Sequence, residues 1–147
     1  MDSQDFTKLL HVPTCFGCCQ DNPVGLKLKF VFEGKSLVAE FTSNKYHMGP
    51  PDGVHGGVIT AIVDEAFSML VRKTLGHDIR TIKEEFSFKN MASVGEKVTV
   101  KATLLEEKSR VVIAQARVYT DEAVIAEATG TLFKVKKDSK NSRVFSR

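Results

Sequence analysis

Hydrophobic and polar residues alternate along several segments of the chain, a pattern typical of strands with one buried face. In the first segment, 26–32, the hydrophobic positions are Leu26, Leu28, Phe30 and Phe32. A tight turn at 33–35 separates it from a second predicted strand. The remaining predicted strands span 36–42, 81–90, 97–105, 111–120 and 124–135. Short turns join the last three, so we expect these to be antiparallel neighbours.

Between the second and third of these strands, the pattern changes to that of a helix. It predicts a helix over 58–75, with Gly76 as its C-terminal cap. Hydrophobic residues occupy most of its circumference, so we expect the helix in the middle of the structure. One antiparallel sheet of about six strands, curled around this helix, would bury the helix and one sheet face together. The predicted fold class is therefore α+β.

The chain has 147 residues, about the length of one domain. We expect a single domain over 1–135, beginning with a Cys-, Gly- and Pro-rich segment at 1–25, and a flexible polar tail over 136–147. The net charge is +3, and basic residues are concentrated at the C-terminus. A solvated tail is therefore a better interpretation of this charge than a nucleic-acid-binding surface.

The cysteines and the hydropathy pattern bear on the location of the protein. No apolar run is long enough to cross a bilayer, and the N-terminus, MDSQDFTKLL, is unlike a secretion signal. The odd, clustered set of Cys15, Cys18 and Cys19 indicates reduced thiols. We therefore expect a cytoplasmic protein. Cys15 and Cys18 have C-x-x-C spacing and His11 lies upstream, but no second Cys or His pair follows, which favours a structural turn over zinc.

The predicted helix carries two acids in its middle, Asp64 and Glu65. At about 100° per residue, one narrow stripe of the helix holds Gly57, Thr60, Ala61, Asp64, Ser68 and Val71. This stripe of small residues leaves room for a ligand, so a buried Asp64 with a hydroxyl partner would be a general base or a nucleophile. The alternative is that Asp64 pairs with a neighbouring subunit or a backbone N–H. Glu65 faces elsewhere and is interpreted as structural.

The start of the helix offers a different chemistry. His55, Gly56 and Gly57 place backbone N–H groups at a helix N-terminus, where they can form an oxyanion hole, although an ordinary Gly-rich turn remains the alternative. Gly56 and Asp64 are separated by about 12 Å of helical rise, whereas both must come within about 3 Å of one reacting carbonyl. If both are catalytic, Gly56 of one subunit must face Asp64 of another across a two-fold axis. The pattern therefore predicts a homodimer with shared sites.

Two motifs make the chain similar to the hotdog-fold acyl-CoA thioesterases, in particular to the group related to the phenylacetate-pathway thioesterase PaaI. The first is H-G-G followed by D-E, here His55 through Glu65, with the Asp nine residues after the His. The second is C-F-G-C-x-x-x-N-P-x-G-L, here 15–26, in which Cys19 stands where a Gly is often found. The resemblance covers roughly 15–135.

The resemblance implies the hotdog fold and hydrolysis of an acyl-CoA thioester to free acid and coenzyme A. It implies no cofactor besides the coenzyme A of the substrate, and no metal. Asp64 would be the catalytic carboxylate, and the Gly56 N–H, with His55 in the same motif, would polarise the carbonyl. The implied partners are acyl-CoA and a second copy of the chain, with homotetramers as a further assembly, but neither nucleic acid nor a membrane.

Lower-ranked candidates surround this motif. Many members place Asn or Gln six residues before the histidine, whereas this chain has Gly49, so His47 and Met48 are candidates to shape the site; loop packing is the alternative for His47. Ser68 and Thr81 match positions near which some members place a hydroxyl, and packing would explain both equally well. Candidate substrate contacts at the edge of the site are Gly57, Lys89 and Arg110. A solvated surface is the alternative for the two basic residues.

Two other functions remain open at this level. A non-catalytic acyl-CoA-binding or regulatory protein of the same fold is favoured by Gly49 in place of an amide, and disfavoured by Asp64 together with Gly56. A 3-hydroxyacyl dehydratase of the same fold also works with a His and a carboxylate, usually at a different spacing. The sequence leaves open the acyl group, and the choice between base and nucleophile.

Overall fold

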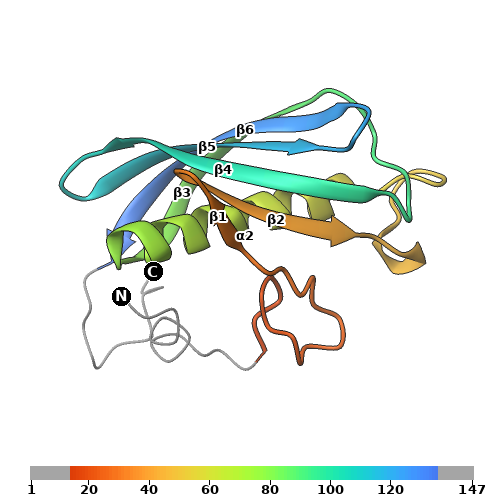
Figure 1. Cartoon of the computed structure of the whole chain (residues 1–147), viewed down its shortest axis with the longest axis horizontal. Helices are drawn as coiled ribbons and strands as arrows, with labels where there is room; N and C mark the ends of the chain where they lie inside the picture. The colour runs from red at the N-terminus through yellow and green to blue at the C-terminus, as the bar shows by residue number, and fades with distance from the viewer. Residues whose placement is uncertain (1–13, 136–147) are drawn as a thin grey trace.

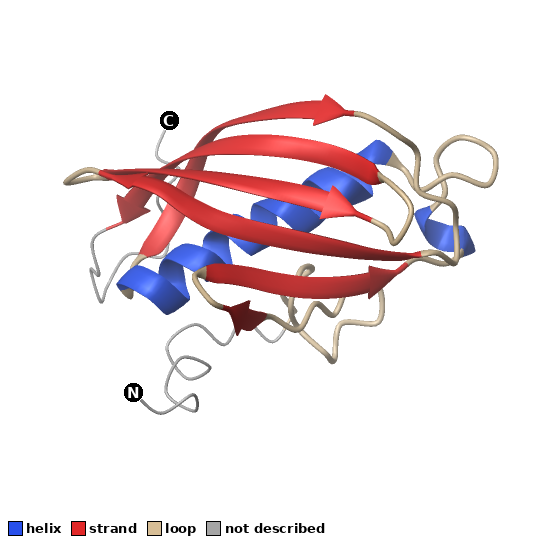
Figure 2. Ribbon diagram, turned by 45° about the horizontal axis from the view of Figure 1, so that its top comes forward, coloured by secondary structure: helices blue, strands red, loops and turns tan. Residues whose placement is uncertain are grey.

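The computed structural model describes residues 14–135, so the predicted tail at 136–147 and the beginning of the N-terminal segment, with His11, lie outside the described residues. Figures 1 and 2 show one curved sheet with a long helix lying along its concave face. The elements are β1 (Val31–Glu33), β2 (Ser36–Thr42), the 3-10 helix η1 (Lys45–His47), α2 (Gly56–Leu75), β3 (Asp78–Phe88), β4 (Lys97–Glu107), β5 (Val111–Tyr119) and β6 (Val124–Val135). This architecture confirms the predicted α+β hotdog fold.

The six strands form a sheet in the order β1-β2-β4-β5-β6-β3, and every neighbouring pair is antiparallel. The predicted antiparallel pairing of the last three strands is confirmed. Strand β3, which follows the helix, crosses to the far edge of the sheet and pairs with β6. The outer side of β3 therefore has no strand neighbour in the single chain.

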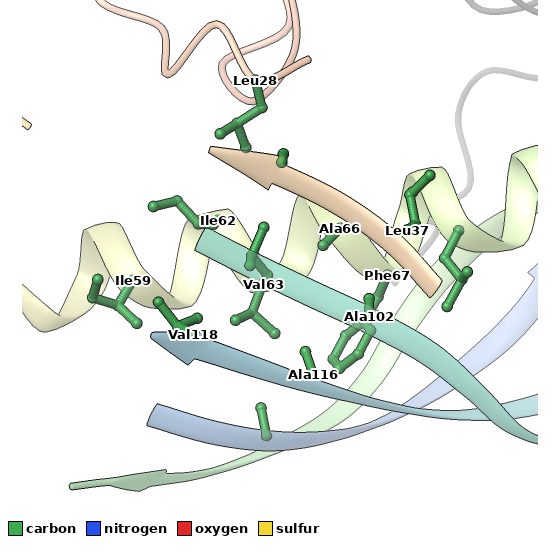
Figure 3. Close-up of a cluster of buried hydrophobic side chains, with 14 of the residues drawn as sticks. Leu28, Leu37, Ile59, Ile62, Val63, Ala66, Phe67, Ala102, Ala116 and Val118 are labelled. Atoms are coloured by element: carbon green, nitrogen blue, oxygen red, sulfur yellow. The ribbon is translucent and has the colours of Figure 1, made fainter. Parts of the chain in front are cut away.

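The core lies between α2 and the concave face of the sheet. Figure 3 shows Phe67 of the helix pointing toward the strands, near the small residues Ala102 and Ala116. The side chains of Ile62, Val63 and Phe67 are fully buried. Burying each such side chain contributes about 1.5–3 kcal/mol, so this interface is what fixes the helix on the sheet.

The first predicted strand is mostly wrong as an element, although three of its four hydrophobic positions are buried as predicted. Leu26, Leu28 and Phe30 are buried, yet β1 begins only at Val31 and Phe32 is 47% exposed. The backbone N–H groups of Leu26 and Leu28 bond to carbonyls of the preceding Cys-rich loop, at 2.7 and 2.9 Å. Leu26 and Leu28 thus pair with a loop, whereas Phe32 belongs to β1 and pairs with Leu37 of β2.

The helix begins at Gly56, two residues before the predicted start, and ends at Leu75 as predicted. Gly76 caps it in the left-handed conformation, with φ of 69°, and donates its N–H to the Arg72 carbonyl. The predicted small, polar stripe is only partly correct, because Gly57 and Asp64 are exposed but Val71 is fully buried. The helix therefore covers one face of the sheet and presents an exposed face that includes Asp64.

Among the helices of residues 14–135, none has the length and hydrophobicity needed to cross a membrane.

Candidate functional site

The start of α2 has one backbone donor left over. His55 is the N-cap, and its Nδ1 accepts a 2.8 Å hydrogen bond from the Gly57 N–H, while its carbonyl accepts from the Val58 N–H at 2.9 Å. The Gly56 N–H, the first of the helix, has no acceptor among the described residues. Gly56 is itself exposed. A free N–H at a helix N-terminus is a suitable donor to a developing oxyanion.

The loop before the helix is held by His47. The His55 N–H donates to the His47 carbonyl at 2.8 Å, and His47 Nδ1 accepts from the Asn44 N–H at 3.0 Å. The His47 ring packs edge-on against Phe41 with centroids 5.1 Å apart. Met48 forms an isolated bridge with Val54. These contacts hold the backbone of His55 in place.

Gly49 lies directly against His55. A Cβ added to Gly49 would stand 2.8 Å from His55 Cα, a separation that real Cβ atoms do not show. An Asn or Gln at this position would therefore require the loop to shift. The glycine is explained by the close approach of the two segments that lead into the helix.

Asp64 lies on the exposed side of α2 and is held by a residue of the edge strand. Its Oδ1 accepts a 2.7 Å hydrogen bond from the Thr81 hydroxyl of β3. The expected burial of Asp64 is corrected here, because Asp64 is exposed in the single chain. Its hydroxyl partner is Thr81, because β3 passes beside the helix. No hydrogen bond joins Ser68 to Asp64 within 14–135. Thr81 thus fixes one oxygen of the Asp64 carboxylate.

Glu84 is a second carboxyl group at this position, and the sequence did not single it out. Burial, together with the negative charge of Asp64 and a hydrogen bond to it, raises the pKa of Glu84 from 4.5 to about 8. Its Oε1 is buried and has no hydrogen-bond partner in the described part of the chain. At neutral pH, Glu84 is therefore mostly protonated.

Glu84 reaches Asp64 because β3 is irregular. The register of β3 against β6 shifts between Thr81 and Lys83, which leaves Ile82 as a bulge. In a regular strand, residues an odd number apart point to opposite faces, so Thr81 and Glu84 would be separated. The extra residue brings both to the side of Asp64. A bulge of this kind has no clear signature in the sequence.

An apolar groove of about 430 Å³ adjoins Gly56. Its wall includes two exposed hydrophobic side chains, Phe88 and Met91, which are 52% and 56% exposed. Lys89, a predicted substrate contact, lines the same groove. Gly56, two exposed hydrophobic side chains and a basic residue therefore line one groove.

The structure separates Arg110 from this groove within one chain. The Arg110 carbonyl accepts from the Lys134 N–H, and Lys134 pairs across β6 and β3 with Ile79, close to the end of α2. Gly56 lies at the other end of the 20-residue helix. Arg110 and Gly56 thus belong to opposite ends of the molecule.

Comparison with known proteins matches the part of the chain that carries this site. A family model described as the Thioesterase superfamily matches residues 53–127. Comparison with curated protein sequences gave no match. Solved structures with the same fold include a phenylacetic acid degradation-related protein of Ralstonia eutropha, 25% identical, covering 75% of this chain and 86% of that one, with a TM-score of 0.68.

Two other solved structures show the same fold at lower identity. The Escherichia coli PaaI protein, from the phenylacetic acid degradation operon, is 14% identical over 75% of this chain and 80% of its own, with a TM-score of 0.69. A Streptococcus pneumoniae thioesterase protein solved with coenzyme A is 15% identical over 74% of this chain and 88% of its own, with a TM-score of 0.68. The long helix and curved sheet are common to these proteins.

Proposed function

The chain belongs to the thioesterase superfamily, and on this premise we propose that it hydrolyses an acyl-CoA thioester to a free acid and coenzyme A. The observation that carries the proposal is the pair of groups exposed along α2: the free N–H of Gly56 and the Asp64 carboxylate held by Thr81. The first suits a carbonyl oxygen that becomes negative. The second suits the activation of water or direct attack on the carbonyl carbon.

In the proposed reaction, the thioester carbonyl oxygen accepts a hydrogen bond from Gly56, with His55 fixing the backbone of this first turn. Asp64 takes a proton from a water molecule that attacks the carbonyl, or its carboxylate attacks first and water then cleaves the acyl-enzyme. In both routes the tetrahedral intermediate expels the coenzyme A thiolate. Removal of one oxyanion donor typically slows such reactions by about 10²–10³-fold, so Gly56 must be positioned accurately.

One chain does not hold both groups at one carbonyl, since about 12 Å of helix separates them. We propose that a second copy completes the site by pairing along β3. This strand forms an edge of the sheet over 11 residues, and Ile82, at its bulge, is 59% exposed. A long edge strand with an exposed hydrophobic residue is a template for strand pairing. An isologous contact would bring Asp64 of each copy toward Gly56 of the other.

The groove beside Gly56 is the proposed place for the apolar part of the substrate, and Lys89 is the proposed partner of a coenzyme A phosphate. Gly57 contributes to the turn that His55 caps. For His47, Met48 and Gly49, the proposed role is to hold His55 in place. Ser68 remains a candidate substrate contact on the exposed side of the helix. In the proposed assembly, any substrate contact made by Arg110 would come from the second copy of the chain.

The test is release of free thiol from a panel of acyl-CoA thioesters that differ in chain length and in aromatic or aliphatic character. We expect at least one to be hydrolysed by the wild type and not measurably by Asp64→Ala. Glu65→Gln is the matched control, because it changes the adjacent acid and should retain hydrolysis. Binding of the panel without turnover by either protein would exclude the hydrolase and favour an acyl-CoA-binding role. Loss of water from a 3-hydroxyacyl thioester would instead identify a dehydratase.

A further inference from the structure

The Cys-rich loop contacts the middle of α2 on a different side from Asp64. Cys15 Sγ lies 3.3 Å from Cys18 Sγ and 3.8 Å from Glu65 Oε1. One ligating atom from each of these three residues lies within 4.8 Å of the other two. All three side chains are partly buried. Two thiols and a carboxylate, separated by 50 residues in sequence, thus converge on one point.

We infer that Cys15, Cys18 and Glu65 form a binding site for a zinc ion, with water as a fourth ligand. Thiolates and carboxylates both bind Zn²⁺, and sulfur donors disfavour the hard ions Mg²⁺ and Ca²⁺. The sequence alone did not predict this site, because Glu65 replaces the second Cys or His pair that zinc motifs usually contain. Only folding brings this carboxylate to the C-x-x-C loop.

The observed separations fit a tetrahedral ion closely. With Zn–S bonds of about 2.3 Å and Zn–O bonds of about 2.1 Å, two sulfur ligands lie about 3.8 Å apart and a sulfur and an oxygen about 3.6 Å apart. The two sulfurs would move apart by about half an ångström, and the sulfur–oxygen distance would change by less. Side-chain rotation alone can supply such movements.

The loop is already shaped for ligation. The Cys18 N–H points at Cys15 Sγ at 3.5 Å, so a backbone donor is available to stabilise a thiolate at Cys15. The carbonyls of Phe16 and Gly17 accept from Leu26 and Leu28, which fixes the loop against the buried segment. The three ligands therefore need little ordering when an ion binds.

Gly17 allows the loop to approach Glu65. A Cβ on Gly17 would lie 2.5 Å from Cγ, Cδ and Oε2 of Glu65. Any larger residue would push this carboxylate away from the two cysteines. The close packing of Gly17 on Glu65 is consistent with a carboxylate held in a fixed place between the loop and the helix.

Binding balances as an exchange of ions: one Zn²⁺ enters, and the Cys15 and Cys18 thiols release two protons to the buffer. No electron transfer is involved. The ion would join the loop to α2 at the residue next to Asp64. It would therefore stabilise the folded chain, by an amount that rises with the logarithm of the zinc concentration once this exceeds the dissociation constant. This inference is independent of the proposed hydrolysis, because its readout is metal binding.

The test uses the full chain, kept reduced and stripped with a chelator, and titrated with Zn²⁺ in one series and Co²⁺ in another. We expect one Zn²⁺ per chain, a rise in melting temperature, and the thiolate-to-metal absorption of a tetrahedral Co²⁺ site. Cys15→Ser, Cys18→Ser and Glu65→Gln should each weaken Zn²⁺ binding at least about tenfold. Cys19→Ala and Asp64→Asn, which change a neighbouring thiol and the adjacent carboxylate, should bind as the wild type does.

Several results would overturn the inference. These are no stoichiometric binding by the wild type, a Co²⁺ spectrum without thiolate bands, or equal binding by the three ligand variants and the wild type. Circular dichroism should establish that each variant is folded. A second measurement avoids substitution: in the wild type, bound Zn²⁺ should slow alkylation of two thiols per chain. If the two thiols instead form a disulfide quantitatively with oxidised glutathione while zinc offers no protection, the pair is redox-active and the zinc site is rejected.

Discussion

The Thr81 hydroxyl, on the edge strand β3, donates a 2.7 Å hydrogen bond to Oδ1 of Asp64 on helix α2. This bond joins the two elements at the point where the strand has no strand neighbour on its outer side. It orients a carboxylate that would otherwise rotate freely on an exposed helix face. The position of Asp64 is thus determined by β3 as well as by α2.

Replacing Thr81 tests this orientation. Thr81→Val keeps the shape of the side chain but removes the donor, and a hydrogen bond to a charged group contributes about 1.5–3 kcal/mol. We expect kcat for thioester hydrolysis to fall by about ten- to a hundredfold, with a smaller change in KM. Thr81→Ser keeps the hydroxyl and should retain most of the rate. Equal rates for the Val and Ser variants would contradict a role for the hydrogen bond.

Glu84 should make stability depend on pH. Its folded-state pKa, about 8, is raised above the ordinary 4.5, so the folded chain holds a proton that the unfolded chain releases between these values. Its contribution to stability is therefore fully present below about pH 4.5 and is lost as the pH rises through about 8. We expect Glu84→Gln, which cannot ionise, to lose less melting temperature than the wild type between pH 5 and pH 8.5.

The control for this comparison is Glu85→Gln. Glu85 is the neighbouring acid on β3, is largely exposed, and forms a surface ion pair with Lys83 at 2.8 Å. Such pairs contribute little to stability. The Glu85 variant should therefore follow the wild-type curve of melting temperature against pH. Parallel curves for the wild type and both variants would show that Glu84 does not hold the extra proton.

The sequence predicts the elements whose contacts are local. The three strands after 97 are joined by short turns, so their antiparallel pairing follows from neighbouring residues alone. The end of the helix at Gly76 follows from a single left-handed residue. The place of β3 at the far edge beside β6 depends on contacts between distant segments. Hydrophobic periodicity does not encode such pairings.

In the candidate site, too, the sequence predicts what depends on local residues and misses what depends on distant segments. Gly56 and Asp64 are both identified by a local motif, and their separation follows from helical rise. The partners of the two acids come from elsewhere in the chain: Thr81 and Glu84 from β3, and the C-x-x-C loop beside Glu65. The bulge at Ile82 reverses the face on which Glu84 would be expected. For this reason, a regular alternating strand would have placed Glu84 on the face away from Asp64.

Removing the Gly56 N–H is possible without removing its helix. Proline lacks this donor and is well tolerated at the first position of a helix, and His55 already has the extended φ and ψ, −59° and 133°, that a residue before proline adopts. We expect Gly56→Pro to fold normally and to lose about 10²–10³-fold in kcat. Gly56→Ala keeps the N–H, and its Cβ would meet Phe88 at an ordinary 3.8 Å, so its loss should be much smaller.

Two inactive variants should restore activity to each other if sites are shared between copies. In a mixed dimer of Asp64→Ala and Gly56→Pro, one site receives both substitutions and the other receives an intact Gly56 from one chain and an intact Asp64 from the other. Random exchange in an equimolar mixture, after mild unfolding and refolding, makes about half of the dimers mixed, so roughly a quarter of the wild-type activity should return. The single variants, treated identically and assayed apart, are the controls. A mixture that forms hybrid dimers, as native mass spectrometry can establish, yet stays as inactive as its components would show that Gly56 of one copy and Asp64 of the other do not act in one shared site.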